Sequence, residues 1–159
     1  MSCDCEKMAE RIAKAEKVVN KYMWFSAGAG FIPMPVVDTV ALSGVQMILL
    51  NELSKIYEVE FFKNKAKNII STIISALAAD ISSYATLSVV KFVPGIGTVL
   101  GMLSMPAYSA ASTYALGKVF IQHFESGGTL LTFDPTKVRE YYKEMFAKGQ
   151  EIYEESKKK

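Results

Sequence analysis

The middle of this 159-residue chain lacks charge. Residues 22–51 contain one charged side chain, Asp38; residues 68–90 contain only Asp80; and residues 92–117 contain none. A helix needs about 20 mainly apolar residues to cross a bilayer, so each of these segments is long enough. All three are rich in Gly, Ala, Ser and Thr, which allow helices to pack closely in lipid or in a protein core. The pattern therefore points to a location and an assembly, and it indicates no reaction.

The residues that usually carry catalysis or bind metals are equally scarce. The chain has a single histidine, His123, and two cysteines, Cys3 and Cys5, which are too few for a zinc site without other ligands. A lone histidine also argues against a hydrolytic triad, and no GxSxG or HExxH motif is present. We therefore expect no metal, no cofactor and no enzymatic activity, because catalysis requires titratable groups that converge in a pocket.

Two glycine pairs and the net charge exclude two further kinds of function. Gly28-x-Gly30 and Gly95-x-Gly97 do not complete a phosphate-binding loop, and neither follows a predicted strand. Helix breaks and close packing explain these glycines. The net charge is only +2, which provides no basic field for a nucleic acid partner.

The spacing of apolar residues predicts helices throughout the chain. Apolar side chains recur at three- and four-residue steps, and no segment alternates with a period of two over a useful length. The predicted fold class is all-α, with helical hairpins, a proline-broken apolar segment and amphipathic helices at both ends. We expect one domain over residues 1–159, with an apolar core at 22–128 and charged amphipathic helices at 1–21 and 134–159. The expected helices span residues 4–23, 36–57, 68–92, 98–123 and 136–155.

Prolines and glycines mark where these helices end. Pro33 and Pro35 separate the first helix from the second, and the turn Pro94–Gly97 separates the two helices of a hairpin. Pro106 falls inside the fourth predicted helix and is expected to kink it or split it in two. Asp134-Pro135 is typical of an N-cap followed by the first helical residue, so the last helix is expected to begin there.

The two isolated carboxylates, Asp38 and Asp80, have two interpretations. An ionisable group in an apolar segment is costly and usually has a partner or a task, so the pair would form an ion or proton site. In the structural interpretation, Asp38 faces the positive end of the dipole of the second helix, and Asp80 hydrogen-bonds to Ser, Thr or a lysine. The structural interpretation is favoured, because transport normally needs more spans and more polar groups.

Three short motifs carry a resemblance to a known family. They are an IPxPxxD box, Ile32-Pro33-Met34-Pro35-Val36-Val37-Asp38; a PGxG box, Val93-Pro94-Gly95-Ile96-Gly97; and a TxALG box, Thr113-Tyr114-Ala115-Leu116-Gly117. With them, residues 22–128 resemble the YcjF-like bacterial domain of unknown function, which occurs in predicted inner-membrane proteins and behind Era-like GTPase domains. The resemblance implies a helical, membrane-associated domain that works beside a GTPase and has no established catalytic residues. Because this chain contains no P-loop, any GTPase would be a separate protein.

We expect a membrane protein with both termini in the cytoplasm. The hairpin of residues 68–117 would enter the bilayer, and residues 24–50 would enter beside it or re-enter from the same side. Lys91, next to the hairpin turn, would snorkel to the far interface unless the hairpin stops short of crossing. The alternative is a soluble all-α bundle that buries the same segments and acts as a protein-interaction module. Basic residues flank the apolar segments on the proposed cytoplasmic side: Lys14, Lys17, Lys21, Lys63, Lys65 and Lys67.

The first predicted helix offers a further contact with lipid. Its second half is basic, which suits a solvated helix, a helix packed on its own domain or one lying on an anionic membrane surface. Tyr22 and Trp24 stand where an interfacial aromatic anchor is expected.

Small residues predict self-association. They provide more close-contact surface than one hairpin can use, and the terminal helices add apolar stripes that need cover. We therefore expect a homo-oligomeric scaffold that organises or remodels membrane, with the lipid bilayer and a separate GTPase as partners. The small residues lie on the fourth predicted helix at Gly101, Ser104, Ala107 and Ala111, and on the third at Ala76, Ala79 and Ser83.

Overall fold

Five α-helices form the described part of the chain, which confirms the predicted all-α class. The computed structural model describes residues 2–29, 35–84 and 105–159, with side chains for residues 4–28, 41–76 and 106–159. No β-strand occurs within these ranges. In chain order the helices are α1 (Ser2–Ala29), α2 (Pro35–Ile56), α3 (Lys63–Tyr84), α5 (Met105–Glu125) and α6 (Arg139–Lys157).

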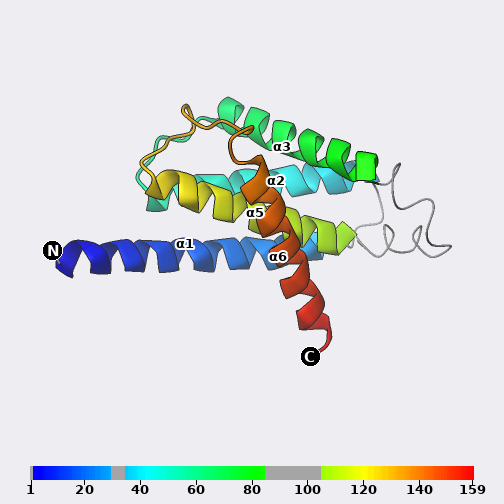
Figure 1. Cartoon of the computed structure of the whole chain (residues 1–159), viewed down its shortest axis with the longest axis horizontal. Helices are drawn as coiled ribbons and strands as arrows, with labels where there is room; N and C mark the ends of the chain where they lie inside the picture. The colour runs from blue at the N-terminus through cyan, green and yellow to red at the C-terminus, as the bar shows by residue number, and fades with distance from the viewer. Residues whose placement is uncertain (1, 30–34, 85–104) are drawn as a thin grey trace.

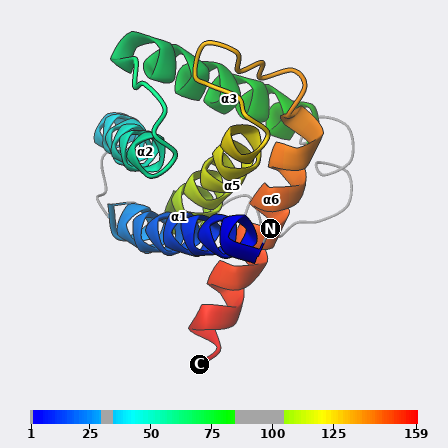
Figure 2. The same ribbon diagram turned by 90° about the vertical axis from the view of Figure 1, so that its left-hand side faces the viewer.

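Helix α5 lies at the centre of the bundle (Figure 2). It packs against α1, α2 and α6, while α3 packs against α2. Figure 1 shows α1 and α3 running in one direction, α2 and α5 running in the opposite direction, and α6 crossing them steeply. From Pro106 to Gly117 every residue of α5 except Tyr108 is buried. Small side chains along this stretch allow neighbouring helices to approach on several sides.

Two glycines set the closest contacts of α5. A Cβ atom at Gly117 would lie 2.7 Å from Cγ1 of Val19 in α1, and closer still to Cγ2. On another side of α5, a Cβ atom at Gly149 of α6 would lie 3.0 Å from Cα of Ala111. Because any side chain at these two positions would overlap its neighbour, glycine is what allows α1 and α6 to approach α5 so closely.

Aromatic rings close the core at the C-terminal end of α5. Phe120 is fully buried, and its ring stacks on that of Phe133 with the centroids 4.5 Å apart. The ring of His123 lies edge-on to Phe133 at 5.1 Å, and its Nε2 is 2.8 Å from the carbonyl oxygen of Thr129. The single histidine is therefore a packing residue that ties the turn after α5 to the core.

A polar network crosses the core between α2, α5 and α6. Gln46 Nε2 donates a 3.0 Å hydrogen bond to Ser112 Oγ, which also hydrogen-bonds with the Tyr142 hydroxyl at 3.0 Å. Burial raises the pKa of Tyr142, so its hydroxyl remains neutral. On α1, Ser26 Oγ donates a 3.0 Å hydrogen bond to the carbonyl oxygen of Ser109. Satisfied polar networks of this kind specify which residues of neighbouring helices face one another.

The predicted helix limits agree with the structure to different degrees. Helix α2 begins and ends one residue before its predicted limits, whereas α3 begins five residues earlier than predicted, at Lys63. Helix α1 continues to Ala29 instead of ending at Met23. The extension is stabilised by burial, because Ser26 and Ala27 both lie in the core.

The prediction that Asp134 caps the last helix is wrong. Asp134 Oδ1 accepts hydrogen bonds from the backbone N (3.0 Å) and Oγ1 (2.6 Å) of Thr136, which close a turn ahead of the helix. Helix α6 begins only at Arg139, and its N-cap residue Val138 makes no side-chain capping bond. The aspartate thus caps an isolated turn, as aspartates often do.

The structure does not test whether Pro106 kinks or splits the predicted helix, because the residues immediately before Met105 lie outside the described ranges. Helix α5 begins at Met105, so Pro106 lies in its first turn. The missing N–H of a proline costs no hydrogen bond there, because the first N–H groups of a helix have no partner within it. Residues 98–104 of the predicted helix lie outside the described residues.

Helices α2 and α5 end in the same hydrogen-bond pattern with different residues. After α5, the N–H groups of Gly127 and Gly128 bond to carbonyl groups three and five residues earlier, at 3.0 and 2.9 Å. After α2, Glu58 and Val59 make the equivalent bonds at 3.3 and 2.8 Å. Both ends are Schellman motifs, in which one residue adopts positive φ: Gly127 at 82° and Glu58 at 55°.

Replacing Glu58 with glycine is expected to stabilise the chain by about 1 kcal/mol, because a side chain is strained at this φ and glycine is not. The matched substitution Gly127→Ala introduces the same strain after α5 and should destabilise by about 1 kcal/mol. Urea unfolding followed by circular dichroism measures both. A Glu58→Gly variant less stable than the parent chain would mean that the carboxylate contributes more than the strain costs.

Candidate membrane-facing end of the bundle

Four helix ends meet at one end of the bundle (Figure 1). They are the C-terminal ends of α1 and α3 and the N-terminal ends of α2 and α5. Residues 30–34 connect α1 to α2, and residues 85–104 connect α3 to α5. Both connecting segments therefore attach at this end, and Lys91 is the single charged residue in their sequences. We call it the linker end.

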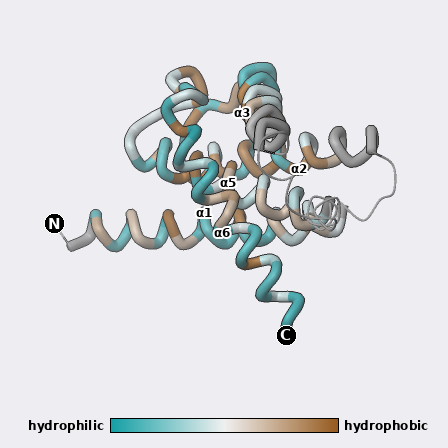
Figure 3. Tube along the Cα trace, turned by 45° about the vertical axis from the view of Figure 1, so that its right-hand side comes forward, coloured by the Kyte–Doolittle hydropathy of each residue, from teal (hydrophilic) through white to brown (hydrophobic). Residues whose placement is uncertain are grey.

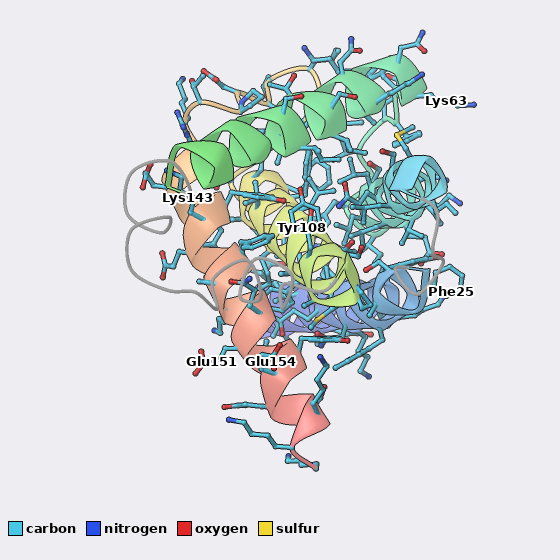
Figure 4. All side chains as sticks on the ribbon, turned by 90° about the vertical axis from the view of Figure 1, so that its right-hand side faces the viewer. Phe25, Lys63, Tyr108, Lys143, Glu151 and Glu154 are labelled. Atoms are coloured by element: carbon cyan, nitrogen blue, oxygen red, sulfur yellow. The ribbon has the colours of Figure 1, made fainter. Side chains whose placement is uncertain are left out.

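Near the linker end, α1 exposes two adjacent aromatic side chains. Trp24 is 43% exposed and Phe25 is 63% exposed. Figure 4 shows Phe25 at the edge of the molecule in a view onto this end. The Trp24 ring stacks on Tyr153 of α6, with the centroids 6.0 Å apart and 30° between the planes. Adjacent exposed apolar side chains of this size are typical of a surface that contacts a partner.

Of the two predicted aromatic anchors, Trp24 is exposed and Tyr22 is not. Tyr22 is only 7% exposed, and its hydroxyl donates a 2.6 Å hydrogen bond to Glu52 of α2. This hydrogen bond, together with burial, raises the pKa of Tyr22 to about 12. Tyr22 follows Val19 by three residues on the buried face of α1, so it joins α1 to α2. Phe25 takes the outer position instead.

The charges on this half of α1 are unevenly paired. Glu16 accepts a 2.6 Å hydrogen bond and ion pair from Nζ of Lys118 in α5. Lys17 and Lys21 are exposed and have no carboxylate partner among the described residues. The outer face of α1 before Trp24 thus carries uncompensated positive charge.

The C-terminal end of α6 adds a cation beside Tyr153. Nζ of Lys157 lies 4.7 Å from the ring centroid of Tyr153, the residue on which Trp24 stacks. Figure 4 shows Glu151 and Glu154 on α6, on the opposite side of the view from Phe25. The last turns of α6 are hydrophilic along the tube in Figure 3.

In the N-terminal half of α1, an ion pair joins this helix to the end of α5. Arg11 donates two 3.3 Å hydrogen bonds to the carboxylate of Glu125, at the end of α5. The guanidinium also lies 5.1 Å from the ring centroid of Tyr57, which follows α2. Hydrogen bonding to Glu125 raises the pKa of Arg11, which is charged in any case. No group of three potential metal ligands occurs among the described residues.

The predicted motif and assembly residues that the structure describes all lie in the core. Ala107, Ala111 and Thr113 are buried in α5, and Thr113 Oγ1 has no hydrogen-bond partner. Gly117 is buried against Val19. Packing within one chain is enough to explain the small side chains of Ala107 and Ala111, and self-association stays a prediction.

The remaining predicted site residues have no described side chains. Pro35 begins α2, so Asp38 falls in the first turn as predicted, and Asp80 lies in α3. The ion-site hypothesis for the two carboxylates therefore stays untested. The residues that lie wholly outside the described ranges are Pro33, Pro94, Gly95, Gly97, Gly101 and Ser104.

The predicted membrane hairpin is described only in its two arms, α3 and α5, which run in opposite directions. Its turn falls within residues 85–104, outside the described ranges. Among the residues that are described, no helix combines the length and apolarity needed to cross a membrane.

Comparison with known proteins gives a family and a relative. The family model described as "Domain of unknown function (DUF697)" matches residues 2–151. Magnetosome membrane protein 22 of Magnetospirillum gryphiswaldense (strain DSM 6361 / JCM 21280 / NBRC 15271 / MSR-1) is 30% identical over 139 residues, which cover 87% of this chain and 71% of the relative. No solved structure matches.

Proposed function

The chain belongs to the DUF697 family of unknown function, and from that premise we propose that it is a membrane-associated helical scaffold. The relative in Magnetospirillum is named as a membrane protein, which supports this location. The expectation of a family of unknown function is confirmed, whereas the association with YcjF-like proteins and Era-like GTPases stays a prediction.

The observation that carries the proposal is the exposed aromatic pair near the linker end. Trp24 and Phe25 are exposed on the same bundle whose linker end carries the attachments of segments 30–34 and 85–104. Aromatic side chains at the level of lipid headgroups, next to apolar sequence, are typical of proteins held at a bilayer. We place the termini in the cytoplasm, as their charged sequences favour.

The scaffold would act by assembly and partner binding rather than by catalysis. We propose that it self-associates, organises or remodels the membrane and recruits a separate GTPase. In the described core, Gln46, Ser112 and Tyr142 form a network that joins three helices. This favours a role without enzymatic turnover.

A second candidate is an interaction module built on the same bundle without a membrane role. The deep burial of α5 favours it, because α1, α2 and α6 already cover this helix within one chain. In that case Trp24 and Phe25 would contact a protein partner.

We expect the full-length chain in its native host to stay in the membrane pellet after carbonate washing, because apolar segments held in lipid resist alkaline extraction. The same membranes, treated with a lysine-reactive crosslinker, should yield dimers and larger species. Complete release into the supernatant would contradict integral membrane association, and a monomer as the sole crosslinking product would contradict the scaffold.

A further inference from the structure

We propose that the outer face of α1 at residues 17–25 docks on a bilayer containing anionic lipid. The inference rests on the proposed membrane association and adds the surface and the lipid chemistry. Lys17, Lys21, Trp24 and Phe25 recur at three- and four-residue steps, so they share one face of α1.

Neighbouring rings fix the positions of the two aromatic side chains on this face. Trp24 is stacked on Tyr153, which is itself 5% exposed and therefore fixed in the core. The edge of Tyr22 supports Phe25, with centroids 6.4 Å apart and 72° between the planes. Indole and phenyl rings presented in this way insert at the boundary between headgroups and acyl chains. Because the rings are already held in place, their insertion costs little conformational entropy.

The charges around the aromatic pair favour anionic over neutral lipid. Glu16, the acidic residue next to Lys17, is already paired with Lys118. Lys17 and Lys21 therefore project positive charge that no described carboxylate offsets. Each basic residue held at an anionic surface strengthens binding by about fivefold. A bilayer with negative headgroups is the partner complementary to both parts of the face.

The chain contains one tryptophan, so the fluorescence of the full-length protein reports on Trp24 alone. Mixing the purified protein with vesicles of phosphatidylglycerol and phosphatidylcholine should shift its emission to shorter wavelengths. Phosphatidylcholine brominated near the top of its acyl chains should quench that emission. Vesicles of phosphatidylcholine alone should bind more weakly, and added salt should weaken binding to the mixed vesicles.

Two matched sets of variants separate the face from the rest of the surface. Lys17→Glu with Lys21→Glu should weaken binding to mixed vesicles by at least about twentyfold. Lys63→Glu with Lys137→Glu makes the same change in net charge at exposed lysines outside α1 and should change binding less than about threefold. Similarly, Phe25→Ser should reduce the emission shift of Trp24, whereas Leu131→Ser, at a comparably exposed residue, should not.

Three outcomes would overturn the inference. If the protein binds vesicles without a change in Trp24 emission and both lysine pairs behave alike, it is held at the membrane by another surface, and only the inference fails. If Trp24 becomes shielded through self-association without lipid, the face is a protein contact. If the protein binds neither vesicles nor native membranes, the proposed function fails as well.

Discussion

Replacing Gly117 with leucine is expected to lower the free energy of unfolding by about 3 kcal/mol. A side chain at this position would overlap Val19, which is 1% exposed and is therefore enclosed by the core. Valine is β-branched and has one strongly preferred rotamer in a helix, so it cannot turn aside. The helices α1 and α5 would have to separate. Urea unfolding of the full-length chain, followed by circular dichroism, measures the loss.

Gly44 provides the control, because it lies inside α2 and a Cβ atom there would meet nothing within 4 Å. Gly44→Ala should stabilise the chain by about 1 kcal/mol through helix propensity alone. The double variant Val19→Ala, Gly117→Ala should lose less stability than the sum of the two single variants, since alanine at position 19 makes room for the new methyl group. A Gly117→Leu variant as stable as the parent would contradict the described contact between α1 and α5.

Phe120→Ala is expected to destabilise the chain by about 3–5 kcal/mol, as is usual for truncation of a buried phenyl ring. Phe120 is fully buried and stacks on Phe133, and its ring centroid lies 5.5 Å from that of Phe124. Removing the Phe120 ring therefore leaves a cavity between the other two rings. The same truncation at Phe25, which is 63% exposed, should change stability by less than about 0.5 kcal/mol. Comparable losses in the two variants would mean that Phe25 is buried in solution.

The helical class and most helix positions follow from local sequence, because three- and four-residue periodicity and proline breaks are local signals. Helix α2 was predicted to within one residue. The end of α1 was not, because a tertiary contact stabilises it, and the start of α6 was not, because a local turn competes with the helix cap. Ser26 extends α1 by bonding to Ser109, and Asp134 bonds to Thr136 in a turn instead of capping α6. The contact of Ser26 has no signal within its own segment, whereas the turn at Asp134 is a local pattern that competes with a helix cap at the same residue.

Only part of the candidate site was predicted, because the predicted end of the first helix was too early. Trp24 was identified as an interfacial residue, but the first helix was predicted to end at Met23. With that limit, Phe25 could not be placed on the same helical face as Lys17 and Lys21. Periodicity continued past Met23 would have shown this face. The burial of Tyr22 could not be predicted from the local sequence, because Tyr22 bonds to Glu52 of another helix.

The small residues of α5 are compatible both with contacts between copies of the chain and with helix packing within one chain. Ala107 and Ala111 suggested contacts between copies, but both are buried against neighbouring helices in one chain. An Ala107→Leu substitution would therefore disturb the fold before it tested assembly. Crosslinking of the unmodified chain avoids that ambiguity.

Because α1 is fixed against α5, it sets the distance between its N-terminal turns and the aromatic pair. Arg11, Glu16 and Val19 contact Glu125, Lys118 and Gly117 of α5 in turn, so α1 is held against its neighbour over several turns. The helix continues from Asp4 to Trp24 without a break, a length of about 30 Å at 1.5 Å per residue. Whatever binds the free N-terminal turns of α1, which extend past the bundle in Figure 1, is held at that distance from the aromatic pair.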